Sequence, residues 1–237
     1  MQSFVERMVE FWAYVLVLLP SLANGTVETL KVFALTLALS LPLGLPVALG
    51  SISRIPPLKW LCRGYVWLFR GTPLMLQLMF FYYGLGIIGN KYGLGFLIMD
   101  RFPAAILTFA LNYAAYFAEI YRAGIQSIDY GQYEAAKSLG FRPWQTMRMI
   151  IIPQTIKRIL PPVSNETITL VKDTGLVMVI ALPELMKAAK DAANRDVDTT
   201  AYLITAVIYL LLTLVLTLFS NWLEKRYSRF EAKEESA

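Results

Sequence analysis

The chain has 237 residues, of which 57% are hydrophobic and only 16% are charged, and its formal net charge is +5. This composition is too apolar for an ordinary soluble domain. The chain contains no histidine and a single cysteine, which excludes histidine-based catalytic or metal sites, intrachain disulfides and cysteine-based metal clusters. The basic residues flank apolar blocks, a pattern typical of membrane topology signals and not of nucleic-acid binding.

The first apolar segment is predicted to form a helix at residues 3–19 that ends before Pro20. Its apolar run, Phe11–Leu19, is too short to cross a membrane. Its flanks carry Glu6 and Glu10, and no small-residue cleavage pattern follows, which argues against a cleaved signal peptide. Because Trp12 and Tyr14 suit the headgroup level of a bilayer, we expect this helix to lie on the membrane surface.

Five later segments are each long enough to cross about 30 Å of hydrocarbon as a helix. Residues 32–53, 71–90, 102–118 and 199–223 contain no charged side chain, and a further block at 159–182 is apolar apart from Glu166, Lys172 and Asp173. These blocks predict an all-α integral membrane protein, a single transmembrane domain covering residues 1–237. Its predicted spans are residues 25–53, 64–90, 102–126, 155–182 and 199–223.

The distribution of lysine and arginine predicts the orientation of these spans. Basic residues are more numerous in 51–70, 122–158 and 224–237 than in the stretches on the other side of the membrane. Because cytoplasmic loops carry the excess of Lys and Arg, we expect the N-terminus outside and the C-terminus in the cytoplasm.

The longest hydrophilic stretch between predicted spans is the cytoplasmic loop at residues 127–153, which has helix signals in order. Asp129 with Gln132 three residues later resembles a capping box, and good helix formers follow. Gly140 is a natural C-terminal stop, and Pro143 fits the first turn of a second helix. The loop is therefore predicted to be a helix–glycine turn–helix.

The same loop resembles the EAA loop of ABC importer permeases, whose pattern is EAA-x3-G-x9-I-x-L-P. Glu134-Ala135-Ala136 is followed after three residues by Gly140 and after nine more by Ile150-Ile151-Ile152-Pro153, so that only Ile152 departs, standing where leucine is usual. Further stretches, spread over roughly residues 20–225, are similar to the polar-amino-acid branch, the histidine, glutamine, arginine and cystine type of uptake permease. They are Arg70-Gly71-Thr72-Pro73 with Gln77, Asn112-Tyr113-Ala114-Ala115-Tyr116 with Ala118-Glu119-Ile120, Gly124-Ile125-Gln126-Ser127-Ile128, Gly131-Gln132, Leu160-Pro161-Pro162 with Asn165, and Leu170-Val171-Lys172-Asp173-Thr174.

The resemblance implies the type I importer permease fold and a multi-pass protein of the bacterial cytoplasmic (inner) membrane. It implies a transport subunit that translocates polar amino acids and works with a second copy or a paralogue, ABC ATPase subunits and an extracytoplasmic solute-binding protein. Glu134, Ala135, Ala136 and Gly140 would couple the chain to the ATPase. The chain has no G-x-x-x-x-G-K-[ST] motif, so ATP and magnesium belong on that partner, and we expect neither enzyme activity nor a cofactor or metal in this chain. Gly175 departs from the family, which commonly has serine after Lys-Asp-Thr.

Polar residues inside the predicted third span are candidates for substrate binding. Asn112, Tyr116 and Glu119 recur at i, i+4 and i+7 and so share one helix face, which could line a pathway. The alternative for Glu119 is an ion pair with Arg122 at i+3, and the alternative for Asn112 is an interhelical hydrogen bond.

The other candidates for substrate binding are Thr72, Gln77, Lys172 and Asp173. Thr72 and Gln77 could equally form interhelical hydrogen bonds. Lys172 and Asp173 are adjacent and point roughly 100° apart on a helix, so one could face a cavity while the other pairs with a neighbouring span.

A different class of function, a subunit of an ATP-independent secondary transporter or channel, agrees less well with the sequence. Such transporters usually carry paired repeats, and none is visible here. A membrane-bound enzyme or scaffold is a third class, but no catalytic motif supports it. Only the importer explains the patterned loop at residues 127–153.

Overall fold

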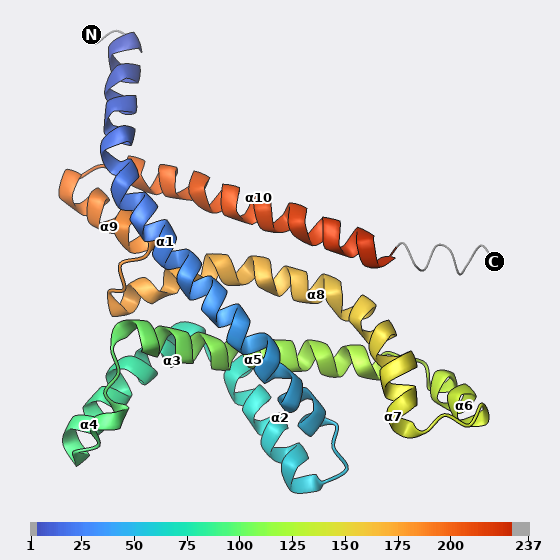
Figure 1. Ribbon diagram of the computed structural model, residues 1–237. Helices are drawn as coiled ribbons and strands as arrows, with labels where there is room; N and C mark the ends of the chain where they lie inside the picture. Colours follow the sequence, from blue (N-terminus) through green and yellow to red (C-terminus); the bar gives the residue numbers. More distant parts are fainter. Residues whose placement is uncertain (1–3, 229–237) are drawn as a thin grey trace. The chain divides into compact units, whose positions relative to one another are not determined.

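The computed structural model describes residues 4–228, and every regular element in this part of the chain is helical (Figure 1). The predicted all-α class is therefore confirmed. Two π-helical turns, Phe80–Gly84 and Met147–Ile151, and two 3-10 segments, Gly95–Leu97 and Thr174–Ile180, separate some of the α-helices. The α-helices are α1 (Phe4–Ser51), α2 (Pro56–Gly71), α3 (Leu74–Met79), α4 (Leu85–Tyr92), α5 (Arg101–Gln126), α6 (Tyr130–Ser138), α7 (Pro143–Thr146), α8 (Ile152–Asp173), α9 (Leu185–Asp196) and α10 (Thr200–Ser228).

The described residues form two compact units. The first unit comprises the described residues of Met1–Thr36 together with Met75–Thr108 and Thr169–Leu214. The second unit comprises Leu37–Leu74, Phe109–Ile168 and the described residues of Val215–Ala237. Helices α1, α5, α8 and α10 contribute residues to both units.

Helix α1 is continuous from Phe4 to Ser51, so no break separates the predicted surface helix from the predicted first span. Residue 3, where that surface helix was expected to begin, lies outside the described residues. Pro20 removes only one backbone hydrogen bond, and in an apolar segment the neighbouring turns keep theirs because no water replaces them. Membrane placement of residues 4–19 stays a prediction.

The predicted second span, 64–90, is broken in the structure. Helices α2 and α3 meet at Thr72 and Pro73, and the axis of the pair bends by 102° between Pro56–Gly71 and Leu74–Tyr92. Proline disfavours helical geometry in the residue before it, and Thr72 is accordingly extended, with φ −119° and ψ 146°. The Arg70-Gly71-Thr72-Pro73 stretch is therefore a local helix breaker.

Two helices within residues 4–228 are long and apolar enough to cross a membrane, Glu6–Ser51 and Thr200–Tyr227, and the bent pair makes a third if it is one span. Helices α5 and α8 occupy the predicted third and fourth spans. Both contain polar side chains, among them Asn112 and Glu119 in α5 and Asp173 in α8. The five-span topology stays a prediction.

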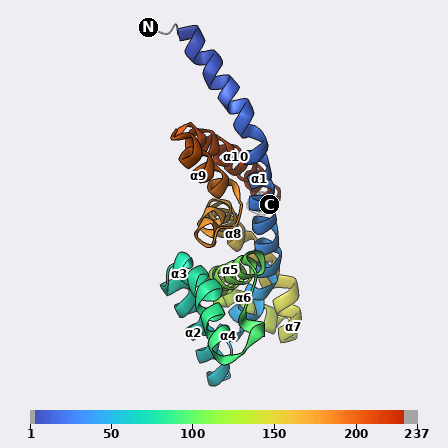
Figure 2. The same ribbon diagram turned by 90° about the vertical axis from the view of Figure 1, so that its left-hand side faces the viewer.

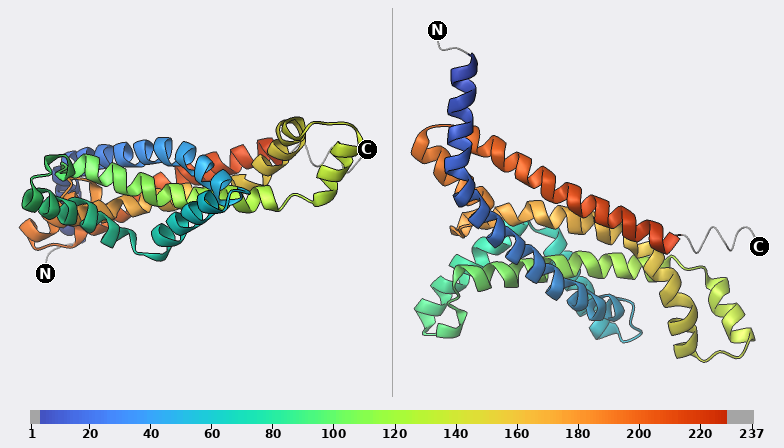
Figure 3. Two further views of the ribbon diagram at one scale, coloured as in Figure 1. Left: turned by 90° about the horizontal axis from the view of Figure 1, so that it is seen from below. Right: turned by 45° about the horizontal axis from the view of Figure 1, so that its top comes forward.

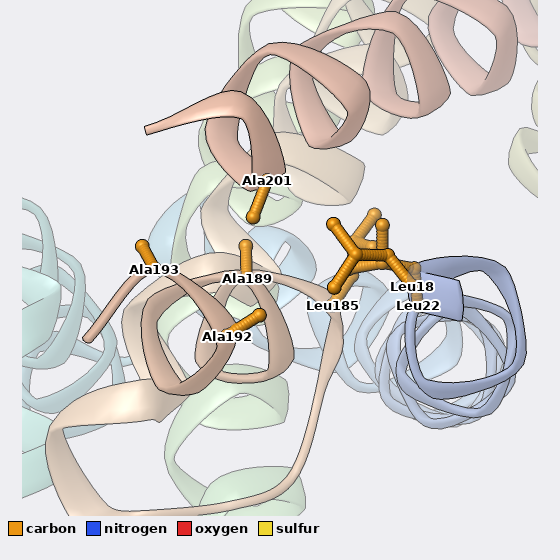
Figure 4. Packing of buried hydrophobic residues seen from close by; sticks show 7 residues of the cluster. All are labelled: Leu18, Leu22, Leu185, Ala189, Ala192, Ala193 and Ala201. Atoms are coloured by element: carbon orange, nitrogen blue, oxygen red, sulfur yellow. The ribbon is translucent and has the colours of Figure 1, made fainter. Parts of the chain in front are cut away.

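The core of the first unit joins α1, α9 and α10 through small and branched apolar side chains. Figure 4 shows Leu18 and Leu22 of α1 beside Leu185, with Ala189 of α9 directed at Ala201 at the start of α10 and Ala192 directed toward the leucines. Figure 2 shows α9 beside these first turns of α10. Small residues let helix backbones approach closely. In a membrane, where lipid tails are as apolar as the side chains, such close van der Waals packing holds helices together. The buried alanines of α9 are Ala189, Ala192 and Ala193.

Contacts in the second unit hold α1 and α2 against α5. A Cβ built on Gly44 would lie 3.0 Å from the Phe117 Cβ and 3.1 Å from the Ala118 nitrogen, so glycine allows α1 to approach α5 closely. The Tyr121 hydroxyl donates to the Leu41 carbonyl at 3.3 Å, and the Tyr65 hydroxyl of α2 donates to a carbonyl of α5. These half-buried tyrosines therefore find polar partners on neighbouring helices.

Candidate functional site

The loop at 127–153 folds as the predicted helical hairpin. Asp129 caps α6, because its Oδ1 accepts from the Gly131 nitrogen at 2.6 Å. Figure 3 shows α6 and α7 as two arms joined by a short turn. At the second arm the Gln145 side chain accepts from the Arg142 backbone nitrogen at 2.9 Å, and Pro143 occupies the first helical position.

Gly140 ends α6 with a specific hydrogen-bonding pattern. The Gly140 nitrogen donates to the Lys137 carbonyl and the Phe141 nitrogen donates to the Ala136 carbonyl, both at 3.0 Å. These two bonds define a Schellman motif, which places its C′ residue in the left-handed region. Gly140 has φ +79° there, a conformation that residues with a side chain rarely adopt.

Helix α6 has an inner face and an outer face. Ala136 is buried, whereas Glu134 and Ala135 are exposed. The outer surface of the hairpin also presents large apolar side chains, with exposed fractions of 73% for Tyr130 and 76% for Leu139. Exposed apolar side chains beside a carboxylate are typical of a protein interface.

Two polar contacts attach the hairpin to α8. The Gln154 amide donates to the Gln132 side-chain oxygen at 3.2 Å, and the Arg158 guanidinium donates to the Ser127 carbonyl. Ile151, between α7 and α8, is fully buried. These contacts connect the hairpin to the N-terminal turns of α8.

The polar face of α5 contacts the C-terminal turn of α2. The Asn112 amide donates to the Phe69 carbonyl at 3.0 Å, and the Arg70 guanidinium carbon lies 5.1 Å from the centre of the Tyr116 ring. The first contact is the interhelical hydrogen bond that the sequence left open for Asn112. The second is a cation–π contact.

Glu119 forms the ion pair with Arg122 that the sequence left open. Arg122 Nε donates to Oε2 at 2.8 Å and Nη2 to Oε1 at 2.5 Å, while Arg70 Nη1 lies 3.9 Å from Oε1. A bidentate arginine–carboxylate pair fixes both groups in direction and distance. The carboxylate charge of Glu119 is thus compensated within the chain.

A cavity of about 330 Å³ in the second unit adjoins this ion pair. Arg63, Arg70 and Arg122 line it, against the single carboxylate of Glu119, and Ser51, Val66 and Trp67 complete its wall. Three guanidinium groups around one carboxylate leave an excess of positive charge. Such a cavity favours an anion over an ammonium group.

The remaining predicted substrate residues are distributed over both units. Thr72, in the second unit directly after α2, donates to the Leu68 carbonyl of that helix at 2.8 Å. Gln77, Lys172 and Asp173 belong to the first unit. Gln77 is buried and Lys172 is exposed. Asp173 is half-buried at the last residue of α8, where the chain changes from α-helix to the 3-10 segment Thr174–Ile180.

The sequence did not single out Glu184, a fully buried carboxylate at the N-cap of α9. Its oxygens accept from the backbone nitrogens of Met186 and Lys187, each at 2.7 Å. They also accept from the Tyr209 hydroxyl at 3.3 Å and the Thr29 hydroxyl at 3.5 Å. Glutamate is not a favoured N-cap residue, so no local signal marks it.

Helices α1, α9 and α10 therefore meet at the Glu184 carboxylate in the first unit. Burial raises the pKa of the Glu184 carboxyl to about 7, although the hydrogen bonds from α9 act to lower it. Gly175, the departure from the family pattern, lies beneath this junction: a Cβ there would be 3.2 Å from the Tyr209 hydroxyl oxygen. Glycine at this position leaves room for the Tyr209 hydroxyl to reach Glu184.

The described part of the chain can be examined for side chains that could together bind a metal ion. Residues 4–228 contain no group of three or more Cys, Asp or Glu side chains placed to hold a metal ion, and the sequence has no histidine.

Within residues 4–228, the long apolar helices and the capped hairpin agree with the membrane protein that the sequence predicts. The chain belongs to the family described as binding-protein-dependent transport system inner membrane component, whose model matches residues 40–229. It is therefore a permease subunit, and the predicted permease family is confirmed.

Curated relatives extend over most of this chain. It is 37% identical to the probable amino-acid ABC transporter permease protein YckA of Bacillus subtilis over 89% of this chain and 91% of that protein. It is 40% identical to the arginine transport system permease protein ArtQ of the same organism, over 88% and 93% respectively.

Solved structures agree with the type I importer permease fold. A chain from a crystal structure of an amino acid ABC transporter with histidines has a TM-score of 0.81 and 35% identity, covering 95% of this chain and 100% of that one. The methionine ABC transporter MetNI, in an inward-facing conformation, has a TM-score of 0.70 at 18% identity and supports the fold alone.

Proposed function

We propose that this chain is the permease subunit of an ATP-driven importer of polar amino acids. Relatives whose names specify arginine or cystine permeases are 34–40% identical to it over about nine tenths of its length. The observation that carries the proposal is the capped α6–α7 hairpin, with Glu134 exposed and Ala136 packed inward. Co-purification of the tagged chain with an ABC ATPase and with a second permease chain tests the assembly, and a chain that transports amino acids without any ATPase would contradict it.

The hairpin is proposed to seat on the separate ATPase, which holds ATP and magnesium. Its exposed Glu134 supplies charge, and Tyr130 and Leu139 supply apolar area for such an interface. Because Gln132 and Arg158 join the hairpin to α8, closure of the ATPases would move that helix. ATP hydrolysis would thereby be coupled to a rearrangement of the permease.

Charge reversal at the hairpin tests this coupling. Glu134→Lys should abolish most substrate-stimulated ATPase activity and transport in the reconstituted complex, because the variant places a like charge against an interface that accepts a carboxylate. Asp191→Lys, an equal charge reversal on the exposed face of α9, should leave both activities unchanged. Normal stimulated activity in Glu134→Lys would remove the hairpin from the mechanism.

Asp173 is proposed to contact the ammonium group of the substrate. Of the two predicted carboxylates, Glu119 is held by Arg122 in an arginine-rich cavity, whereas Asp173 ends an α-helix at a change of helix type. Transporters commonly bind substrate where a transmembrane helix is interrupted, because the freed backbone groups and the side chain can face the cavity. Thr72, Gln77 and Lys172 remain proposed neighbours of the pathway.

A binding measurement separates the two carboxylates. Asp173→Asn should weaken amino-acid binding to the purified permease–ATPase complex about tenfold to a hundredfold, the equivalent of one charge-assisted hydrogen bond. Glu119→Gln should lower the stability of the complex and leave affinity within about threefold. The reverse result would assign the substrate contact to Glu119, as the polar face of α5 first indicated.

We also propose that the N-terminus lies outside and the C-terminus in the cytoplasm. A cysteine introduced at Arg195, which is well exposed, should react with an impermeant thiol reagent applied to intact cells. A cysteine at Arg142, in the turn of the hairpin, should not react. The native Cys62 is buried and contributes little background. Labelling at position 142 from outside would invert the topology.

A further inference from the structure

A cavity between the first turns of α8 and the last turns of α10 contains none of the proposed substrate-binding residues. One of its lining residues, Arg158, also donates to the Ser127 carbonyl of the coupling loop. The cavity lies within the second unit and has a volume of about 470 Å³. Its charged lining consists of Lys157, Arg158, Lys225 and Glu224. Three cations and one carboxylate leave a net positive charge, so the cavity is suited to an anion.

The same cavity has an apolar side. Leu160 and Pro161 line it on α8, and Tyr227 lines it on α10. Helix α10 continues from the cavity with an exposed apolar face, in which Phe219 is 57% and Trp222 is 53% exposed. An anion-binding rim that passes into an apolar helix face fits an amphipathic ligand better than it fits a free inorganic ion.

The position along the two helices matches the headgroup level of a membrane. Lys157 and Arg158 stand at the start of the predicted span 155–182, and Lys225 follows the predicted span 199–223 by two residues. In the proposed topology both positions lie on the cytoplasmic side. Trp222 and Tyr227 flank Lys225 along α10, and such aromatic residues are enriched at membrane–water interfaces.

We propose that this cavity binds the headgroup of an anionic phospholipid. The phosphate lies among Lys157, Arg158 and Lys225, and the acyl chains lie along Leu160 and the apolar face of α10. Basic pockets between transmembrane helices on the cytoplasmic side bind anionic headgroups through this arrangement. A net positive cavity prefers an anionic lipid to a zwitterionic one. The inference rests on the proposed cytoplasmic placement of these helix ends but not on the identity of the transported substrate.

Native mass spectrometry of the full-length chain, released from detergent with dioleoyl phosphatidylglycerol or dioleoyl phosphatidylcholine, tests the proposal. Wild type should retain phosphatidylglycerol in preference to phosphatidylcholine. A cation near the membrane surface changes affinity about fivefold, so Lys157→Gln combined with Lys225→Gln should weaken phosphatidylglycerol binding about 25-fold. The double arginine variant, Lys157→Arg with Lys225→Arg, keeps the charges and should bind as wild type does.

Arg226→Gln is the matched control. Arg226 neighbours Lys225 on α10 and carries the same charge, but its guanidinium lies 5.5 Å from the Trp222 ring centre and it does not line the cavity. This variant should bind phosphatidylglycerol within about twofold of wild type. An equal loss in Arg226→Gln and in the double glutamine variant would reduce the effect to general surface charge and overturn the proposal.

Two other outcomes would also overturn it. Displacement of the lipid by glycerol 3-phosphate at equal concentration would make the cavity a site for a soluble anion. The second outcome is that wild type binds both lipids equally and that removal of residues 229–237 tightens phosphatidylglycerol binding. This result would show that the acidic C-terminal residues, and not a lipid, occupy the cavity. Each outcome is independent of transport, so an active amino-acid importer without lipid preference would reject this inference alone.

Discussion

Replacing Glu184 by glutamine should remove a pH dependence from the stability of the protein. The carboxyl is fully buried and lies between predicted spans, at the N-cap of α9. Burial raises its pKa from an ordinary value of 4.5 to about 7. The folded state therefore keeps the Glu184 proton over a pH range in which the unfolded state has lost it. Glu184→Gln keeps the shape of the side chain and cannot ionise.

The direction and size of the effect follow from this difference in pKa. The stability that the protonated carboxyl contributes is fully present below about pH 4.5 and is lost as the pH rises to about 7. The gap between the two pKa values corresponds to about 3 kcal/mol of unfolding free energy. The side chains that contact Glu184 are the Tyr209 and Thr29 hydroxyls, which donate hydrogen bonds to it.

The assay is unfolding by increasing mole fractions of dodecyl sulfate in mixed micelles, followed by far-ultraviolet circular dichroism at several pH values from 5 to 8. Wild type should lose stability across this range, and Glu184→Gln should show a nearly flat profile. Asp191→Asn, an exposed carboxylate on the same helix, is the control and should keep the wild-type slope. Equal slopes in wild type and Glu184→Gln would show that the buried carboxyl does not titrate here and would refute the reasoning.

Four further substitutions, of which Gly64→Ala is a control, test the packing and the hairpin. Gly25→Ala should destabilise the protein by about 1–3 kcal/mol, because its Cβ would lie 2.9 Å from the Leu185 Cα. Gly64→Ala is the control. Its Cβ would have no atom within 4 Å, so this variant should be neutral or slightly stabilising in the same unfolding assay. Gly140→Ala should lower the stability of the hairpin by about 1–2 kcal/mol, because φ at this position is +79°. The measurement is hydrogen exchange of the α6 amides, which should become faster. Unchanged exchange would show that the Schellman motif at Gly140 does not stabilise the end of α6. Asn112→Ala should cost about 1–3 kcal/mol by leaving the Phe69 carbonyl without this donor, and an unchanged unfolding midpoint would show that the bond contributes nothing.

The elements that sequence reasoning predicted correctly are those set by neighbouring residues. Asp129 caps α6, Gly140 ends it, and Pro143 starts α7, as the sequence of the loop indicated. Each of these signals acts over three or four residues, through a side chain and a nearby backbone group, so the printed order of residues contains all the information needed. The apolar blocks likewise required helices, since only helices or closed barrels satisfy the backbone in lipid.

The sequence also stated the alternatives for α5 without deciding between them. Glu119 and Arg122 at i and i+3 were a possible pair, and Asn112 was a possible interhelical donor. The structure selects the pair and shows the donor bonded to Phe69, together with Arg70 stacked on Tyr116. Whether a polar side chain in a span faces a cavity or a neighbouring helix depends on the rotation of that helix against its neighbours, which periodicity alone does not specify.

Tertiary structure alone decided the buried junction at Glu184. Thr29 is 155 residues from Glu184 in the chain, and Tyr209 is 25 residues away on another helix. The close approach of α1 at Gly25 and the space at Gly175 bring these side chains to one carboxylate. The sequence by itself determined where the hairpin begins and ends, because those signals depend on local backbone bonding. It did not determine that α1 continues through Pro20 or that the predicted second span breaks at Thr72 and Pro73. Which polar groups are buried together depends on how the helices pack, and that packing sums many weak contacts between residues far apart in the chain.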